Sequence, residues 1–271
     1  MKLFKDNLIT MGQGTPVVLL HSSMSSKLQW YRLMQTMSRD HLMIAVDFYG
    51  CGGSPFPSNP ETFSLGHEIA LVESLLEGLI PGGKPFHIVG HSYGGAVGLR
   101  FTYKARERIL SLTLFEPVAF HLLRGTDEEV LAKVIQLQET VNNYIKQNNY
   151  AAAAEYFIDY YNETGTFASY PKEMQDLLCV SAKKLPLGFQ ALVEEALSLE
   201  DYRNISIPVC LVTGGQSPIN SRRPAELLAD YLPNCRCHVV NGGHMVPLTQ
   251  PELVNPIIES FIRRHSVQGP C

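Results

Sequence analysis

One serine in this chain has a setting suited to covalent chemistry, in the segment Gly90-His91-Ser92-Tyr93-Gly94. An apolar run over residues 86–89 comes directly before it, and helix-type residues follow from Gly95. A Gly-x-Ser-x-Gly between a strand and a helix is typical of a nucleophile elbow, a tight turn that exposes the serine hydroxyl at the edge of a parallel sheet. The pattern therefore predicts Ser92 as a nucleophile. Because so short a motif also arises by chance, other residues must support it.

A serine nucleophile needs a base, and one of the nine histidines stands out. His244 follows Asn241-Gly242-Gly243, just beyond the last predicted strand, so flexible backbone precedes it. Serine before histidine is also the chain order that the elbow architecture requires. We therefore predict that His244 is the base of Ser92.

The elements that must position these two residues alternate between strand and helix. Short apolar runs are typical of strands buried on both faces, and apolar residues at a spacing of 3.6 indicate helices. This alternation predicts an α/β fold with a mostly parallel, doubly wound sheet. The predicted strands cover residues 17–20, 42–46, 86–89, 110–115, 207–212 and 236–240, and the predicted core helices cover residues 28–37, 95–101, 223–231 and 251–263 and a segment from Ser64.

The alternation stops after Pro117 and resumes near residue 207. Thr126-x-x-Glu129 has the pattern of a capping box, so it predicts the start of a helix that runs to about Lys146. Further helices are expected over residues 151–161, 174–184 and 189–199. We therefore expect a core of residues 1–117 and 204–271, with an all-helical cap inserted over residues 118–203.

Composition limits the classes of function. With 271 residues, 45% hydrophobic and 18% charged, the chain is long enough for a large buried core. A net charge of −4 without a basic stripe argues against nucleic acid as a partner. Neither a signal peptide nor an apolar run of about 20 residues is present, which predicts a cytoplasmic protein without a transmembrane segment. The six cysteines lack metal-site spacing, so we expect reduced thiols and no metal.

Several further segments occur in order along the chain, namely Leu19-Leu20-His21, Trp30, Asp47-Phe48-Tyr49-Gly50-Cys51-Gly52-Gly53-Ser54, the serine motif and Gly243-His244. Together they resemble the corresponding segments of the α/β-hydrolase family. The resemblance extends over nearly the whole chain and implies Ser92 as nucleophile and His244 as general base and then general acid. It also implies an oxyanion hole with a first donor at the backbone N–H of Tyr93.

The loop expected to supply the second oxyanion donor departs from the family pattern. The family usually has His-Gly-x after the first core strand, whereas this chain has His21-Ser22-Ser23. The resemblance then implies the N–H of Ser23 as donor. If position 22 requires a left-handed backbone, serine costs about 1 kcal/mol there.

The carboxylate that would complete a catalytic triad with Ser92 and His244 is also displaced from its usual place. Where the family has Gly-x-x-Asp after the strand that resumes the sheet, this chain has Gly214-Gly215-Gln216-Ser217. Some family members place the acid at the end of the preceding core strand, where this chain has Glu116 before Pro117. A carboxylate there fixes the imidazole tautomer and stabilises the imidazolium. The alternative is that Glu116 caps a helix or forms a salt bridge with the insertion.

These residues together predict a serine hydrolase of small carboxylic esters or thioesters that works through an acyl-enzyme and needs no cofactor. The expected partner is a small acyl substrate, and the sequence predicts no oligomeric state. Two alternatives remain open. One is hydrolysis of carbon–carbon bonds in β-diketone-like substrates. The other is a non-catalytic, ligand-binding member of the fold. Ser217 in place of the usual aspartate and the missing glycine of the oxyanion loop favour this second alternative.

Overall fold

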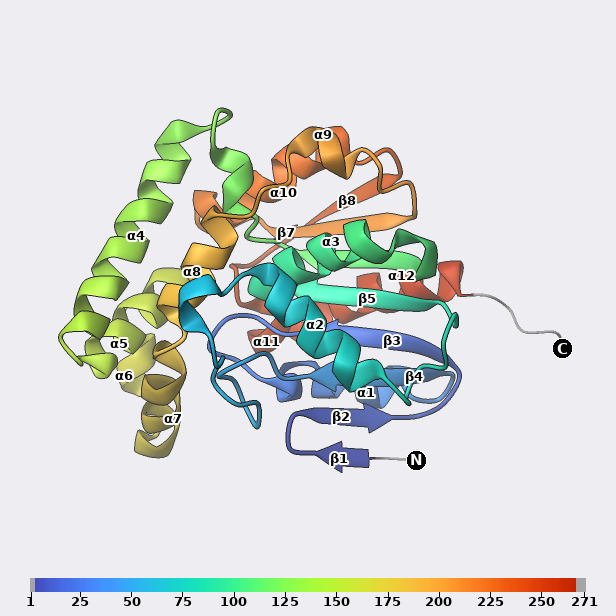
Figure 1. Ribbon diagram of the computed structural model, residues 1–271, viewed down its shortest axis with the longest axis horizontal. Helices are drawn as coiled ribbons and strands as arrows, with labels where there is room; N and C mark the ends of the chain where they lie inside the picture. The colour runs from blue at the N-terminus through green and yellow to red at the C-terminus, as the bar shows by residue number, and fades with distance from the viewer. Residues whose placement is uncertain (1–2, 267–271) are drawn as a thin grey trace, which may run out of the picture.

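The computed structural model describes residues 3–266, and within this range the strands form one eight-stranded sheet (Figure 1). Six strands, from β4 to β8 in the sheet order, are parallel, while β1 and β2 form an antiparallel hairpin at one edge. The predicted α/β fold with a mostly parallel sheet is confirmed. The strand order is β1 (Leu3–Lys5), β2 (Leu8–Met11), β4 (His41–Val46), β3 (Thr15–Leu20), β5 (Phe86–His91), β6 (Ile109–Phe115), β7 (Val209–Gly214) and β8 (Cys235–Val240).

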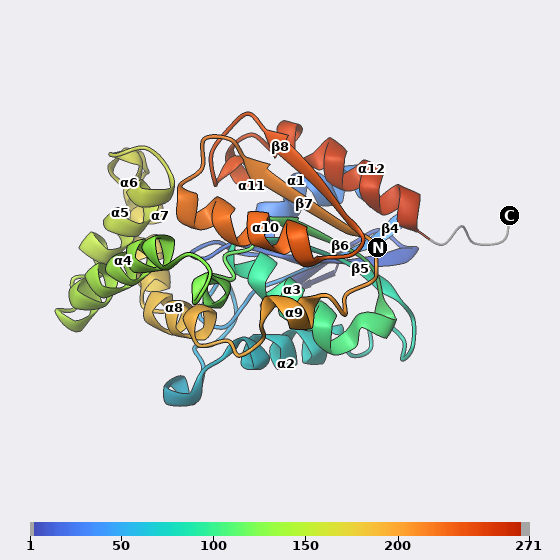
Figure 2. The same cartoon turned by 90° about the horizontal axis from the view of Figure 1, so that it is seen from above.

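Helices cover both faces of the sheet (Figure 2). Each face has its own buried cluster, because strands buried on both sides project apolar side chains in both directions. One face is covered by α1 (Tyr31–Met37), α11 (Val246–Thr249) and α12 (Asn255–His265), and the other by α2 (Leu65–Leu76), α3 (Tyr93–Ala105) and α10 (Ile219–Tyr231). Short 3₁₀ turns are η1 (Lys27–Trp30), η2 (Pro60–Thr62), η3 (Arg106–Arg108), η4 (Phe120–Leu123) and η5 (Pro251–Leu253).

Between β6 and β7 all regular elements are helices, as expected. Five of these helices, α4 to α8, gather at one end of the sheet, and we call them the cap (Figure 1). The division of the chain into two domains stays a prediction. The helices of this insertion are α4 (Glu128–Lys146), α5 (Tyr150–Tyr161), α6 (Thr166–Ser169), α7 (Lys172–Ala182), α8 (Leu185–Val193) and α9 (Leu199–Tyr202).

Two predicted helix boundaries in the insertion were wrong. The first long helix is capped by Asp127, whose side chain accepts a hydrogen bond from the N–H of Val130, while the Thr126 hydroxyl donates to the carbonyl of Leu122. The last predicted helix, 189–199, is α8, which begins and ends earlier. It cannot continue to residue 199 because Ser198 forms a capping box that starts the separate helix α9.

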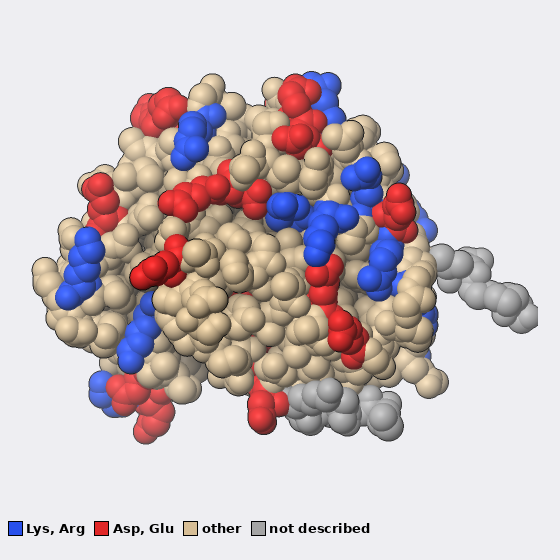
Figure 3. Space-filling model, in the orientation of Figure 1, with Lys and Arg blue, Asp and Glu red and all other residues tan. Residues whose placement is uncertain are grey.

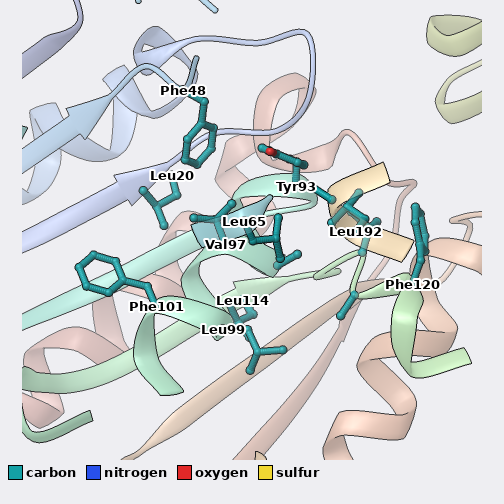
Figure 4. Packing of buried hydrophobic residues seen from close by; sticks show 14 of the residues in the cluster. Leu20, Phe48, Leu65, Tyr93, Val97, Leu99, Phe101, Leu114, Phe120 and Leu192 are labelled. Carbon is teal, nitrogen blue, oxygen red and sulfur yellow. The ribbon is translucent and has the colours of Figure 1, made fainter. Parts of the chain in front are cut away.

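The cap is anchored to the core by a buried charge. Lys184, between α7 and α8, forms an ion pair with Glu68 of α2, and both side chains are almost fully buried. The Lys184 ammonium also lies 4.4 Å from the ring centre of Tyr93, close enough for a cation–π interaction. Figure 4 shows Tyr93 between Phe48 of the core and Leu192 of the cap. The cap therefore packs directly against the residue that follows Ser92.

Candidate active site

Ser92 lies on a strained turn between β5 and α3. Its φ of 55° is unusual for a residue with a side chain, and such strain gathers at functional sites. The flanking glycines are required by close backbone contacts. A Cβ on Gly90 would lie 2.4 Å from the carbonyl oxygen of Gly94, and one on Gly94 would lie 2.4 Å from that of Leu20. Strand and helix thus cross too closely for any side chain, which leaves the hydroxyl at the end of the strand.

The structure brings Ser92, His244 and Glu116 together from three distant parts of the chain. His244 Nε2 lies 2.9 Å from Ser92 Oγ, and His244 Nδ1 lies 2.5 Å from Glu116 Oε2. Since an ionised carboxylate only accepts hydrogen bonds, Nδ1 carries the proton and Nε2 is free to accept from the serine hydroxyl. All three side chains are buried, with 6%, 2% and 0% exposed respectively.

Glu116 is held in place by backbone geometry. It lies just beyond β6 with a φ of 43°, and its second oxygen, Oε1, accepts a 2.6 Å hydrogen bond from the N–H of Gly214. Its own N–H donates to the carbonyl of Val212. The carboxylate is bonded to His244 and to the N–H of Gly214. Among the described residues it therefore neither caps a helix nor forms a salt bridge with a basic residue of the insertion.

Two backbone N–H groups are available near Ser92. Tyr93 is the first residue of α3, and neither its N–H nor that of Ser23 forms a hydrogen bond within residues 3–266. The N–H of Ser22, by contrast, is bonded to Gln29. Position 22 does not have a left-handed backbone, so serine there carries no such strain; the left-handed residue of this loop is Met24, with a φ of 55°. The geometry leaves Tyr93 and Ser23 as candidate oxyanion donors.

Two narrow clefts meet at this site, and both are lined by Ser23, Leu185 and Gly188. The cleft beside Ser92 has a mainly apolar lining, whose further members are Val118, Phe120, Phe157, Tyr161, Phe189 and Leu192. The other cleft lies between the oxyanion loop and Lys184, and its wall also includes His21, Ser22 and Ser181. Apart from the three shared residues, the two clefts are lined by different side chains, and only the first includes Ser92.

Sequence reasoning did not single out several of these residues. The ring of Tyr161, on cap helix α5, lies 4.7 Å from that of His244, but nothing distinguished Tyr161 from the other aromatic residues of the insertion. Burial raises the pKa of Tyr161, so its hydroxyl stays neutral. The sequence did contain a signal for Glu68, because this carboxylate lies on the apolar face of α2. A charge in that position requires a buried cationic partner.

Two turns near the site are held by hydrogen bonds of the buried side chains Asp47 and His21. Asp47 accepts hydrogen bonds from the N–H of Gly53 and of Lys27, and thereby braces the glycine-rich turn. His21 donates from Nδ1 to the carbonyl of Ser22 and accepts at Nε2 from the N–H of Phe48. Burial lowers the pKa of His21 to about 4, which keeps the ring neutral and preserves this donor–acceptor pattern.

Metal ligands, membrane-spanning helices and surface charge are the features of the described residues that concern the expected partners. In residues 3–266 no three histidine, cysteine or carboxylate side chains lie together as metal ligands. Among the described helices, none has both the length and the apolar character needed to cross a bilayer. On the face in Figure 3, side chains of both signs are scattered around a broad uncharged area.

Comparison with known proteins identifies the family. Residues 15–251 match the family described as alpha/beta hydrolase fold. The chain belongs to this family. Monoacylglycerol lipase abhd6-B of Xenopus laevis is 24% identical over 261 residues, covering 93% of this chain and 76% of the lipase. Poly(3-hydroxyalkanoate) depolymerase of Ectopseudomonas oleovorans is 24% identical over 262 residues, covering 94% of this chain and 88% of the depolymerase.

Solved structures of the family superpose over almost the full length of this α/β hydrolase. An alpha/beta hydrolase from a Medee basin deep-sea metagenome library has a TM-score of 0.81 at 17% identity, with 100% of both chains covered. A thermophilic esterase from Thermogutta terrifontis has a TM-score of 0.78 at 20% identity, covering 96% of this chain and 93% of the esterase. At these identities the likeness concerns the fold.

Proposed function

We propose that this α/β hydrolase is a serine hydrolase that cleaves small carboxylic esters or thioesters through an acyl-enzyme. The observation that carries the proposal is the buried hydrogen-bonded chain from Ser92 through His244 to Glu116. A base within 2.9 Å of a serine hydroxyl, itself oriented by a carboxylate, is the arrangement that activates serine for attack. No metal or cofactor is needed for this chemistry.

The mechanism follows from the positions of the protons. Ser92 Oγ attacks the substrate carbonyl as its proton passes to His244 Nε2, and Glu116 stabilises the resulting imidazolium. The N–H groups of Tyr93 and Ser23 bind the oxyanion of the tetrahedral intermediate, and the partial positive charge at the start of α3 adds to this. His244 then protonates the leaving group. Water activated by His244 releases the acyl group and restores Ser92.

The substrate class rests on the lining of the clefts and on the relatives. An apolar, aromatic lining beside Ser92 favours an acyl or aryl group over a polyanion. The similar proteins are named as a lipase, a depolymerase and an esterase, which fits acyl transfer. We propose accordingly that residues 118–203 form a lid on a core of residues 1–117 and 204–271.

Labelling with a fluorophosphonate tests the proposal, because the probe reports an activated serine whatever the natural acyl group. We expect stoichiometric modification, located on Ser92 by mass spectrometry, and none in Ser92→Ala. His244→Ala should fold but label far more slowly, because its serine lacks a base. Folded wild-type protein that fails both to label and to hydrolyse a panel of short-chain esters and thioesters would contradict the proposal.

A further inference from the structure

His91, the residue before Ser92, lies beneath the elbow and is fully buried. Its Nε2 lies 2.9 Å from the backbone carbonyl oxygen of His244, and its Nδ1 lies 3.2 Å from Nε2 of Gln29. Gln29 Oε1 in turn lies 3.0 Å from both the N–H and the hydroxyl of Ser22. One side-chain pair thus joins the oxyanion loop to the loop that carries His244.

The proton positions in this network are fixed by its two ends. The carbonyl of His244 can only accept, so Nε2 of His91 carries the proton and Nδ1 is an acceptor. The N–H of Ser22 can only donate, so the amide of Gln29 presents its oxygen to Ser22 and its NH₂ group to His91. Every hydrogen bond then has one donor and one acceptor, provided that His91 is neutral. Burial and the neighbouring His244 hold the pKa of His91 well below its usual range.

We infer that Gln29 and His91 are positioning residues that set the base and the oxyanion loop relative to each other. The inference rests on the proposed function, because that function gives His244 and Ser23 their roles. Ser22, held by Gln29, immediately precedes Ser23. The elbow is fixed to the same loop, since the N–H of Gly94 donates to the carbonyl of His21. Nucleophile, base and oxyanion donor are therefore joined through buried hydrogen bonds.

The loop before His244 is held at its start, where Gly242 packs against Val246 and its carbonyl accepts a hydrogen bond from the N–H of Gln216. No atom lies within 4 Å of a Cβ built on Gly243, the residue directly before the base. The bond from His91 acts one residue further on, at the carbonyl of His244 itself. A neutral His91 is also the right donor, because its ring centre lies 5.0 Å from that of His244. A charged ring there would oppose formation of the His244 imidazolium during catalysis.

Substitutions of nearly unchanged shape test the inference. Gln29→Glu keeps the acceptor for Ser22 but removes the donor to His91, and Gln29→Met removes both. His91→Leu removes donor and acceptor, whereas His91→Gln retains one of each. The matched control is His87→Gln, four residues earlier on β5, where the histidine is buried and bonded to Ser111 and Ser266 away from the elbow.

We expect Gln29→Glu, Gln29→Met and His91→Leu each to lower kcat about 10- to 100-fold with little change in KM, because misplaced reacting groups slow the chemical step. His91→Gln should recover much of the loss, and His87→Gln should keep wild-type kcat. A Gln29→Met/His91→Leu double variant should lose about as much as either single variant, since both interrupt one chain of hydrogen bonds.

Nitrogen-15 NMR of the histidines separates this inference from the proposed function. We expect a single Nδ1–H tautomer of His244 in the wild type and a mixed or mobile ring in the Gln29 and His91 variants, whether or not Ser92 turns over a substrate. An unchanged His244 spectrum in those variants overturns the inference. So does a loss of kcat that parallels the loss of melting temperature and is shared by His87→Gln, because it would mark a general packing effect.

Discussion

The carboxylate of Glu116 accepts a 2.6 Å hydrogen bond from the N–H of Gly214, the residue that ends β7. In the family, the strand corresponding to β7 is usually followed by the acid itself, at the position of Ser217 here. Glu116 thus reaches His244 from the neighbouring strand while it is bonded to the backbone at the edge of the usual acid loop. The extra methylene of glutamate provides the required reach.

Glu116→Gln should therefore depress turnover severely while the protein remains folded. The amide presents its NH₂ group or an uncharged oxygen to His244, so the tautomer is no longer fixed and the imidazolium loses its counter-charge. We expect kcat to fall by about 10²- to 10⁴-fold, as for replacement of the acid in other serine triads. Steady-state kinetics with circular dichroism provide the measurement. Near-normal turnover in the folded variant would show that Glu116 is not the acid.

Ser217→Asp in the Glu116→Gln background provides a sharper test. Ser217 is buried, and its hydroxyl has no hydrogen-bond partner within residues 3–266, so a carboxylate there could turn toward His244. We expect the double variant to regain part of the turnover that Glu116→Gln loses. Ser217→Ala in the same background is the control and should regain none. Equal activity of the two double variants would argue against a shared role for the two positions.

Breaking the buried ion pair between Lys184 and Glu68 should destabilise the protein markedly. Lys184→Met leaves the Glu68 carboxylate buried without its counter-charge, and a loss of about 3–5 kcal/mol in the free energy of unfolding is expected. Lys184→Met/Glu68→Gln should be less affected, because no unpaired charge remains. Urea denaturation measures both. Lys133→Met, which removes an exposed i,i+4 pair with Glu129, should change the free energy of unfolding by less than about 0.5 kcal/mol.

Substitution by alanine should change the stability of the protein very differently at two glycines of α3. At Gly94 the new Cβ would meet the backbone carbonyls of Leu20 and His21 at 2.4 and 2.5 Å, and backbone cannot move aside cheaply. Gly94→Ala should therefore lower the free energy of unfolding by about 3 kcal/mol or more. At Gly98 the nearest atom is a methyl group of Ile88 at 3.1 Å, so the helical preference of alanine offsets the crowding, and the change should stay within about 1 kcal/mol. Thermal unfolding distinguishes the two, and equal losses would contradict the close strand–helix crossing.

The sequence predicted those parts of the candidate site that depend on local pattern. Ser92 is recognisable because its turn dictates its neighbours, and His244 because it follows a strand and a glycine pair. Glu116 required the family resemblance, since a glutamate before proline has no catalytic signature of its own. Gln29, Lys184 and Tyr161 were not predicted, because their roles depend on which distant residues the fold brings to them. The β1–β2 hairpin was missed for a related reason, as its strands have only three and four residues.

Four buried histidines, His21, His87, His91 and His121, predict that the free energy of unfolding falls on mild acidification. Burial lowers the pKa of His21 and of His121 to about 4, and that of His87 to about 3. At pH 7 both the folded and the unfolded chain leave these rings neutral. Below about pH 6.5 the unfolded chain binds protons that the folded chain does not, so the free energy of unfolding decreases until the folded rings also become protonated.

Each histidine should therefore lower the free energy of unfolding by about 2 kcal/mol between pH 7 and pH 5, because both pH values lie above its pKa in the folded protein. Urea denaturation at the two pH values measures the sum. In His87→Gln the difference between the two pH values should shrink by one histidine's share, even if the variant is less stable at both, because glutamine does not titrate. A difference identical to that of the wild type would mean that His87 accepts a proton in the folded protein as readily as in the unfolded chain.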